Sequence, residues 1–127
     1  MLAFEGHTGP YLQYAHARVR SIFRRAGVEP PPVGAAPLVS EPAERALALQ
    51  LLRFPAAVEA TAEAYSPSRL CSYLFDLATA FTTFYEACRV LVDVETVRTS
   101  RLGLCDLTAR VLELGLSLLG IEAPEQM

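Results

Sequence analysis

Residues 67–88, PSRLCSYLFDLATAFTTFYEAC, carry the pattern that decides the fold of this chain. Apolar side chains recur in this stretch every three or four residues, at Leu70, Leu74, Leu77, Phe81, Phe84 and Cys88. That spacing places them on one side of an α-helix, the side that a bundle buries. We predict that this helix begins at Ser66-Pro67, ends near Val92 and is the longest in the chain, with Phe81 in the core.

A second apolar stripe follows near the C-terminus. Its members are again three or four residues apart: Leu104, Leu107, Val111, Leu114 and Leu118. They predict a last helix that Gly120 stops, preceded by a polar connecting stretch over residues 93–100. We expect the two stripes to face one another.

The rest of the chain predicts three further helices, over residues 8–26, 41–53 and 56–65. Thr8 and Ser40 are expected to cap the first two, and Gly27 to end the first. Four prolines within residues 28–39 predict an exposed loop. No stretch alternates apolar and polar residues as a strand does. The prediction is an all-α bundle of four to five helices, in a single domain over residues 1–127.

The composition is that of a globular protein. Hydrophobic residues make up 52% of the 127 residues, which argues against disorder. No run approaches the roughly 18 apolar residues of a transmembrane helix, and the N-terminus lacks the pattern of a signal peptide. We therefore expect a cytoplasmic protein without a membrane partner.

The cysteines and histidines predict neither a metal site nor a cofactor. Cys71, Cys88 and Cys105 are each 17 residues apart, without the close pair of a zinc site or disulfide framework. We expect these thiols to pack in the core. His7 and His16 lack a partnering cysteine cluster, and no Ser/His/Asp arrangement suggests a catalytic site. We expect no catalytic residue, metal or cofactor in this chain.

The first predicted helix presents two tyrosines and an arginine on one face. In residues 6–18, GHTGPYLQYAHAR, Tyr14 follows Tyr11 by three residues and Arg18 follows Tyr14 by four. Two rings beside a guanidinium form a platform on which unpaired nucleic-acid bases stack, with a phosphate ligand at its edge. The same spacing also fits half-buried core tyrosines beside a solvated arginine.

The charge composition limits how nucleic acid would be bound. All eleven basic residues are arginines, which suit phosphate contacts better than lysines. The net charge is nevertheless −3, whereas a free-standing nucleic-acid binder usually carries a positive excess. Any RNA contact must therefore come from a local patch, and we expect it to be weak for the chain alone.

Three ordered segments together resemble a known family. They are residues 6–18; residues 66–78, SPSRLCSYLFDLA, with Phe84-Tyr85 and residues 88–91, CRVL; and residues 101–105, RLGLC, with 115–127, GLSLLGIEAPEQM. In order and spacing they resemble the C-terminal helical domain of arginyl-tRNA synthetases, the DALR-type anticodon-binding domain. The resemblance covers nearly the whole chain.

The resemblance implies contact with the anticodon loop of an arginine tRNA. The residues that it implies are Tyr11, Tyr14, Arg18, Tyr85, Arg89 and Met127. Tyrosines stack on unpaired bases, and Arg18 can bind a phosphate through a bidentate fork. Arg89 stands where some members carry an aromatic residue, although a guanidinium also stacks on a base. Met127 offers an apolar side chain and a carboxylate.

The catalytic signatures of that family do not occur in this sequence. It contains no His-Ile-Gly-His-like or Lys-Met-Ser-Lys-like motif and no Walker-type loop. We therefore predict an anticodon-binding module that supports arginine–tRNA ligation in a full enzyme without being catalytic alone. The alternative is a stand-alone helical interaction protein, or a tRNA-binding paralogue with weakened RNA affinity. A catalytic domain or another protein would be bound through apolar helix faces.

Overall fold

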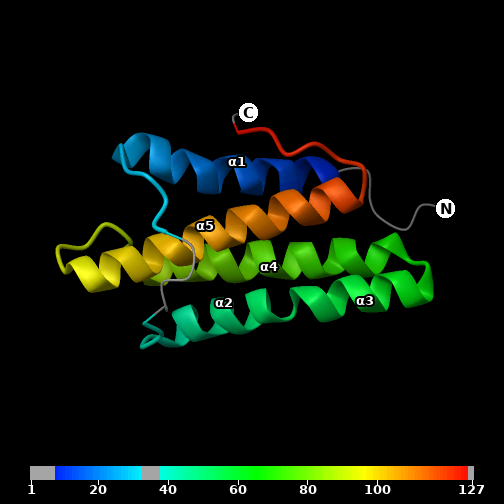
Figure 1. The fold of residues 1–127 in the computed structure, drawn as a ribbon, viewed down its shortest axis with the longest axis horizontal. Helices are drawn as coiled ribbons and strands as arrows, with labels where there is room; N and C mark the ends of the chain where they lie inside the picture. Colours follow the sequence, from blue (N-terminus) through cyan, green and yellow to red (C-terminus); the bar gives the residue numbers. More distant parts are fainter. Residues whose placement is uncertain (1–7, 33–37, 126–127) are drawn as a thin grey trace.

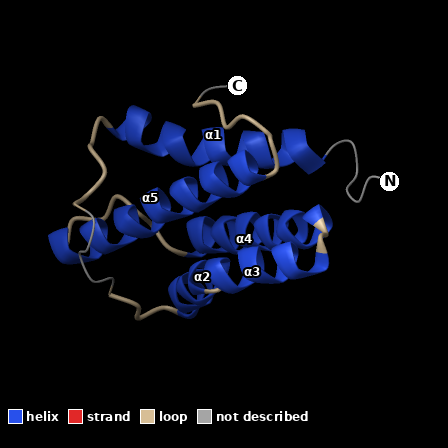
Figure 2. Cartoon of the chain, turned by 45° about the vertical axis from the view of Figure 1, so that its right-hand side comes forward, coloured by secondary structure: helices blue, strands red, loops and turns tan. Residues whose placement is uncertain are grey.

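The described part of the chain folds into five helices. The computed structural model describes residues 8–32 and 38–125, and within these residues it contains helices and loops but no strand (Figure 2). The helices are α1 (Thr8–Ala26), α2 (Pro42–Leu52), α3 (Phe54–Ala64), α4 (Pro67–Ala87) and α5 (Glu95–Leu118). The prediction of an all-α bundle of four to five helices is confirmed.

Helix α4 lies at the centre of the bundle and packs against each of the other four helices. The short helices α2 and α3 lie end to end along one side of α4 (Figure 1). On its other side α4 contacts α5, and α1 in turn packs on α5 and on α4. This packing places side chains of α1 next to side chains of α4, although the two helices are far apart in the sequence.

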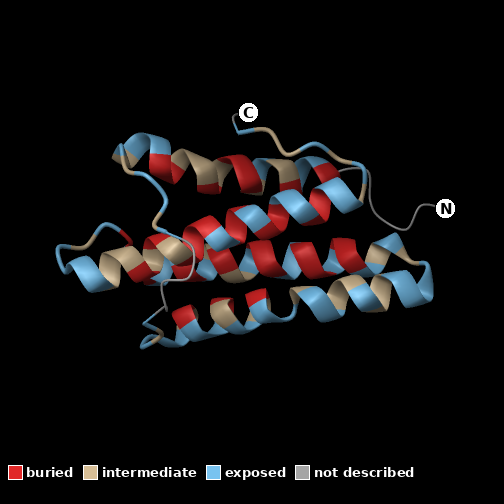
Figure 3. Cartoon of the chain, in the orientation of Figure 1, coloured by how far each residue is buried: buried red, intermediate tan, exposed pale blue. Residues whose placement is uncertain are grey.

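The apolar stripe of α4 forms the core, as predicted. Its six members from Leu70 to Cys88, Phe81 among them, are all buried. Figure 3 shows buried residues along much of α4. Cys71 and Cys105 are buried as well, so the three thiols pack in the interior as expected. Within the described residues, none of the helices combines the length and apolar character needed to cross a membrane.

The boundary between α4 and α5 differs from the prediction. Helix α4 ends at Ala87 rather than near Val92, because Cys88 takes an extended conformation and the following segment buries Val90 in the core. Helix α5 already begins at Glu95, so most of the stretch predicted to be a connector is helical. With 24 residues against 21, α5 and not α4 is the longest helix.

The predicted stripe of α5 has the wrong phase. Leu104 and Val111 are buried, but Leu107, Leu114 and Leu118 are 46%, 51% and 55% exposed. The buried face contains other apolar residues, among them Leu102, Leu112 and Leu116, together with small and polar residues that fit where neighbouring helices approach α5 closely. One example is Thr108, whose hydroxyl donates to the carbonyl of Leu104 at 2.7 Å and is thereby satisfied inside the core.

The caps of the first two helices also differ from the prediction. Thr8 is the first helical residue of α1 rather than its cap. Glu41, not Ser40, is the N-cap of α2, in a reciprocal capping box with Glu44. The Ser40 N–H instead donates to the Glu44 carboxylate at 3.2 Å.

The loops agree with the prediction more closely. Of residues 28–39, the described ones are non-helical and exposed or half-buried. The break between α2 and α3 falls at Arg53, so α3 begins two residues before the predicted start. It ends at Ala64, and the following Tyr65 caps it in a left-handed conformation with φ 50°.

Candidate nucleic-acid interface

Tyr85 lies on the last turn of α4, and one face of its ring packs against the core. Its ring stacks on that of Phe81, with 5.8 Å between the ring centroids and 16° between the planes. Phe81 is buried and also contacts Phe84 at 5.9 Å, whereas Tyr85 is 38% exposed. The core therefore fixes the ring while leaving part of it accessible from outside.

Arg18 of α1 meets Tyr85 across the helix boundary. Its guanidinium carbon lies 5.9 Å from the centroid of the Tyr85 ring, within the range of a cation–π contact. The two residues are 67 positions apart in the sequence, and the packing of α1 beside α4 brings them together. No described carboxylate lies within 4.0 Å of the Arg18 guanidinium.

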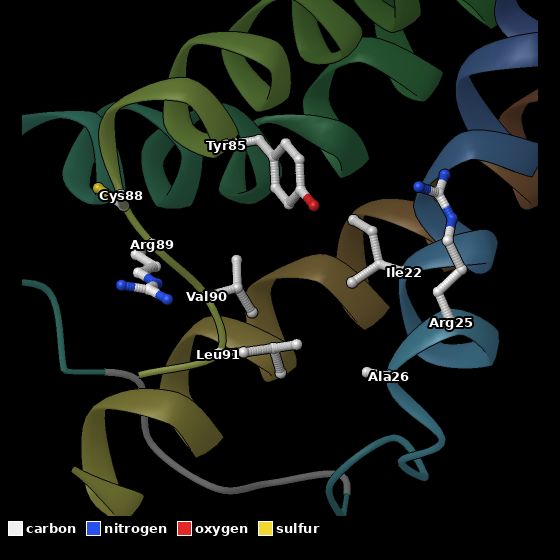
Figure 4. Close-up of a pocket in the computed structure, with 8 residues that line it drawn as sticks. All are labelled: Ile22, Arg25, Ala26, Tyr85, Cys88, Arg89, Val90 and Leu91. Carbon is white, nitrogen blue, oxygen red and sulfur yellow. The ribbon is translucent and has the colours of Figure 1, made fainter. Parts of the chain in front are cut away.

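A hollow opens beside Tyr85, between the last turns of α1 and the segment that follows α4. Its apolar lining comes from both elements, and Figure 4 shows the Tyr85 hydroxyl directed over it, with the stem of Arg25 along the opposite wall. The lining residues are Ile22, Arg25, Ala26, Tyr85, Cys88, Arg89, Val90 and Leu91. An apolar surface bordered by arginines and a tyrosine hydroxyl suits a nucleotide, which combines a flat base with an anionic phosphate.

Arg89 has a fixed backbone and an exposed side chain. Its carbonyl accepts a hydrogen bond from Nη1 of Arg101 at 2.6 Å, and Nε of Arg101 donates to Glu44 at 2.9 Å. Burial alone would raise the pKa of the Glu44 carboxyl, but the Glu41 N–H and the Arg101 guanidinium together hold it below its usual range. Glu44 thus stays charged and anchors Arg101, which positions the main chain of Arg89.

The two tyrosines of α1 have different environments. Tyr11 leans on Phe75 of α4, with 5.2 Å between the ring centroids, so part of its surface is used in packing. Tyr14 is 57% exposed and has no aromatic partner among the described residues. Of the two readings that the spacing left open, Tyr14 fits an exposed platform and Tyr11 fits a half-buried brace.

These side chains lie where α1 and α4 meet, and we call their surface the α1–α4 seam. It comprises Tyr11, Tyr14, Arg18 and Arg25 of α1 with Phe75 and Tyr85 of α4. The sequence-based prediction omitted Phe75 and Arg25. Arg25 follows Arg18 by seven residues, two helical turns, and the same spacing rule would have placed it on the face of Tyr11, Tyr14 and Arg18.

The C-terminal segment runs back along a different side of α1. Three α1 side chains bind its carbonyls: Gln13 donates to Glu122 at 2.9 Å, His16 to Pro124 at 3.0 Å and Arg24 to Glu125 at 2.9 Å. His16 is thus a buried clamp residue. Met127 lies outside the described residues, so its predicted role has no structural description.

The arginines of this surface differ from those that hold the fold together. Within residues 8–32 and 38–125, ion pairs join Arg20 and Arg110 to Asp106, and Arg101 to Glu44. Arg18, Arg25 and Arg89 have no such carboxylate partner in the same residues. Despite the net charge of −3, the seam and the hollow thus carry a local excess of positive charge.

Comparison with known proteins identifies the family of the chain. The family model of the DALR anticodon binding domain matches residues 12–127. A curated arginine–tRNA ligase of Thermobifida fusca is 59% identical over 128 residues, which are all of this chain and 22% of that protein. The chain therefore spans about a fifth of the length of that relative.

Solved structures show the same fold. The arginyl-tRNA synthetase of Thermus thermophilus is similar with a TM-score of 0.81 and 46% sequence identity, covering 98% of this chain and 22% of that one. The arginyl-tRNA synthetase of Plasmodium falciparum has a TM-score of 0.82 at 32% identity, covering 97% of this chain and 22% of that one.

Proposed function

Because this chain belongs to the DALR anticodon-binding domain family, we propose that it binds the anticodon arm of an arginine tRNA along the α1–α4 seam. The observation that carries the proposal is the contact of Arg18 with Tyr85, which joins a guanidinium and a fixed ring from two helices at the surface. Single-stranded RNA is recognised by such surfaces, because its unpaired bases stack on rings and its phosphates pair with arginines.

Each residue of the site has a separate physical role in this proposal. Tyr14 offers the most exposed ring of the seam for stacking, and Tyr85 offers its hydroxyl over the hollow. Arg18 and Arg89 supply charge for phosphates or bases. Tyr11 has a supporting role because it packs on Phe75. For Met127 the proposal rests on the resemblance to the family alone.

The proposal includes a larger protein as the setting of this domain. The relatives named above are arginine–tRNA ligases about five times as long as this chain, which favours a module of such an enzyme over a stand-alone interaction protein. In that setting the domain positions the tRNA, and arginine is activated elsewhere. The exposed leucines of α5, Leu107, Leu114 and Leu118, form an apolar face that would pack against the catalytic part.

The test is a titration of the 127-residue chain with an arginine tRNA and with an unrelated tRNA at several salt concentrations. Tyr14→Ala and Tyr85→Ala should each weaken binding of the arginine tRNA by about 1–3 kcal/mol, the usual contribution of one stacking side chain. Arg18→Ala should also lower the salt dependence by about one phosphate contact. Tyr65→Ala is a matched control, because Tyr65 is 93% exposed and lies at the end of α3, outside the seam.

Two results would count against the proposal. If the wild-type chain binds neither tRNA at low salt, the domain alone lacks useful RNA affinity and the interaction-protein alternative becomes the better account. If it binds, but the three seam variants bind as tightly as Tyr65→Ala, the RNA contact lies on another face of the bundle.

A further inference from the structure

Arg25 is a charged residue of the hollow beside Tyr85 whose side chain is not bound to any other helix or loop of the described residues. It lies in the last turns of α1, and its stem forms the wall opposite the Tyr85 hydroxyl (Figure 4). It is exposed, and no described carboxylate lies within 4.0 Å of its guanidinium. Its Nη2 donates to Ser21 Oγ at 3.0 Å, within its own helix. A guanidinium has five N–H donors, so most of the donor capacity of Arg25 is left for a ligand.

The adjacent residue provides an internal contrast. Arg24 has the same charge and also lies in the last turn of α1, but its Nη1 donates to the Glu125 carbonyl at 2.9 Å. It lines a second hollow together with Arg20 and Glu29, away from Tyr85. Both arginines therefore interact favourably with the negative C-terminal end of α1. Of the two, only Arg25 lies beside Tyr85.

We propose that Arg25 is a further RNA-binding residue, which takes a backbone phosphate of the strand whose base enters the hollow beside Tyr85. This inference rests on the proposed function and adds a ligand group and a residue to it. Arg18 and Arg25 are two helical turns apart, about 10 Å along the axis, so each reaches a different part of the strand. The Tyr85 ring contacts Arg18, and Tyr85 lines the hollow together with Arg25 and the apolar residues Ile22 and Val90. This lining can accommodate an unstacked base.

The experiment compares Arg25→Gln with Arg24→Gln in the 127-residue chain. Both variants remove one positive charge from neighbouring positions of one helix, so they change the long-range electrostatic attraction of RNA by the same amount. The anticodon-arm RNA of an arginine tRNA is titrated against each at increasing salt. We expect Arg25→Gln to lower the slope of log K against log salt by about 0.7–0.9, and Arg24→Gln to change it by much less.

Arg25→Lys adds a test of the contact geometry. Lysine keeps the charge of arginine but lacks its planar guanidinium. Compared with Arg25→Gln, Arg25→Lys should therefore restore the slope of log K against log salt more fully than it restores the RNA affinity. A parallel titration with inorganic phosphate tests whether Arg25 holds a free anion instead. If Arg25→Gln loses inorganic phosphate but keeps its RNA affinity, the assignment to RNA is overturned.

The failure of this inference differs from the failure of the proposed function. If the wild-type chain binds no RNA, the proposed function fails and this inference fails with it. If the wild-type chain binds RNA and Arg18→Ala weakens binding, but Arg25→Gln and Arg24→Gln give equal slopes, the proposed function stands. Arg25 then contributes only net charge, and the inference alone is overturned.

Discussion

Gly115→Ala tests how closely α5 and α4 pack. A Cβ at position 115 would lie 2.6 Å and 2.8 Å from the two methyl groups of Leu74, far inside van der Waals contact. Leu74 is fully buried, so its methyl groups can move away only by displacing other core side chains. We expect an overpacking cost at the upper end of the usual range, about 3 kcal/mol. The better helix propensity of alanine offsets about 1 kcal/mol, which leaves a net loss of about 2 kcal/mol.

The assay is urea unfolding, with the free energy of unfolding taken from the midpoint and slope. Gly103→Ala is the matched control on the same helix, because its Cβ would lie 3.8 Å from Pro31, an ordinary contact. It should stabilise the chain by up to about 1 kcal/mol. In a Leu74→Ala background, Gly115→Ala should lose its cost, since the clashing methyl groups are gone. A Gly115→Ala variant as stable as the wild type would refute the close approach of α5 to α4.

The remaining predictions concern the core. Phe81→Ala should lower the free energy of unfolding by roughly 3–5 kcal/mol, because it removes a buried ring that also supports Tyr85. Urea unfolding measures this loss. A loss below about 1 kcal/mol would contradict the placement of Phe81 in the core. Burial raises the pKa of Cys105 from 9.0 to about 12 and that of Tyr73 from 10.0 to about 12. The unfolded chain therefore releases these protons at lower pH than the folded chain, and stability should fall as the pH rises above about 9, by at most about 1.4 kcal/mol per pH unit for each group. Urea midpoints measured at rising pH follow this fall in stability, and Tyr73→Phe should make it shallower. A midpoint that stays unchanged up to about pH 11 would show that the Cys105 thiol and the Tyr73 hydroxyl are accessible to solvent.

The helices follow from the sequence where one apolar face is wide and regular. The α4 stripe from Leu70 to Cys88 predicts both a helix and its buried side, because large apolar residues gain most from burial on one face. The α5 pattern misleads because Leu107, Leu114 and Leu118 repeat as regularly and yet face outward. Helices that approach α5 closely require small residues at the contact, so Gly115 occupies a core position that hydrophobicity alone does not reveal.

Part of the candidate site also follows from the sequence, and part of it depends on tertiary packing. Helical periodicity alone puts Tyr11, Tyr14 and Arg18 on one face of α1, because residues three and four apart share a side of a helix. Their neighbours depend on which helix packs beside that face, and no local pattern states this. Tertiary packing places Phe75 against Tyr11 and Tyr85 beneath Arg18, and it brings Arg25 to the hollow beside Tyr85. The sequence by itself therefore determined the helices and the face of α1 that carries the tyrosines and Arg18. Only the tertiary structure decided which residues of α4 contact that face, because contacts between distant residues arise when all the apolar faces are buried together.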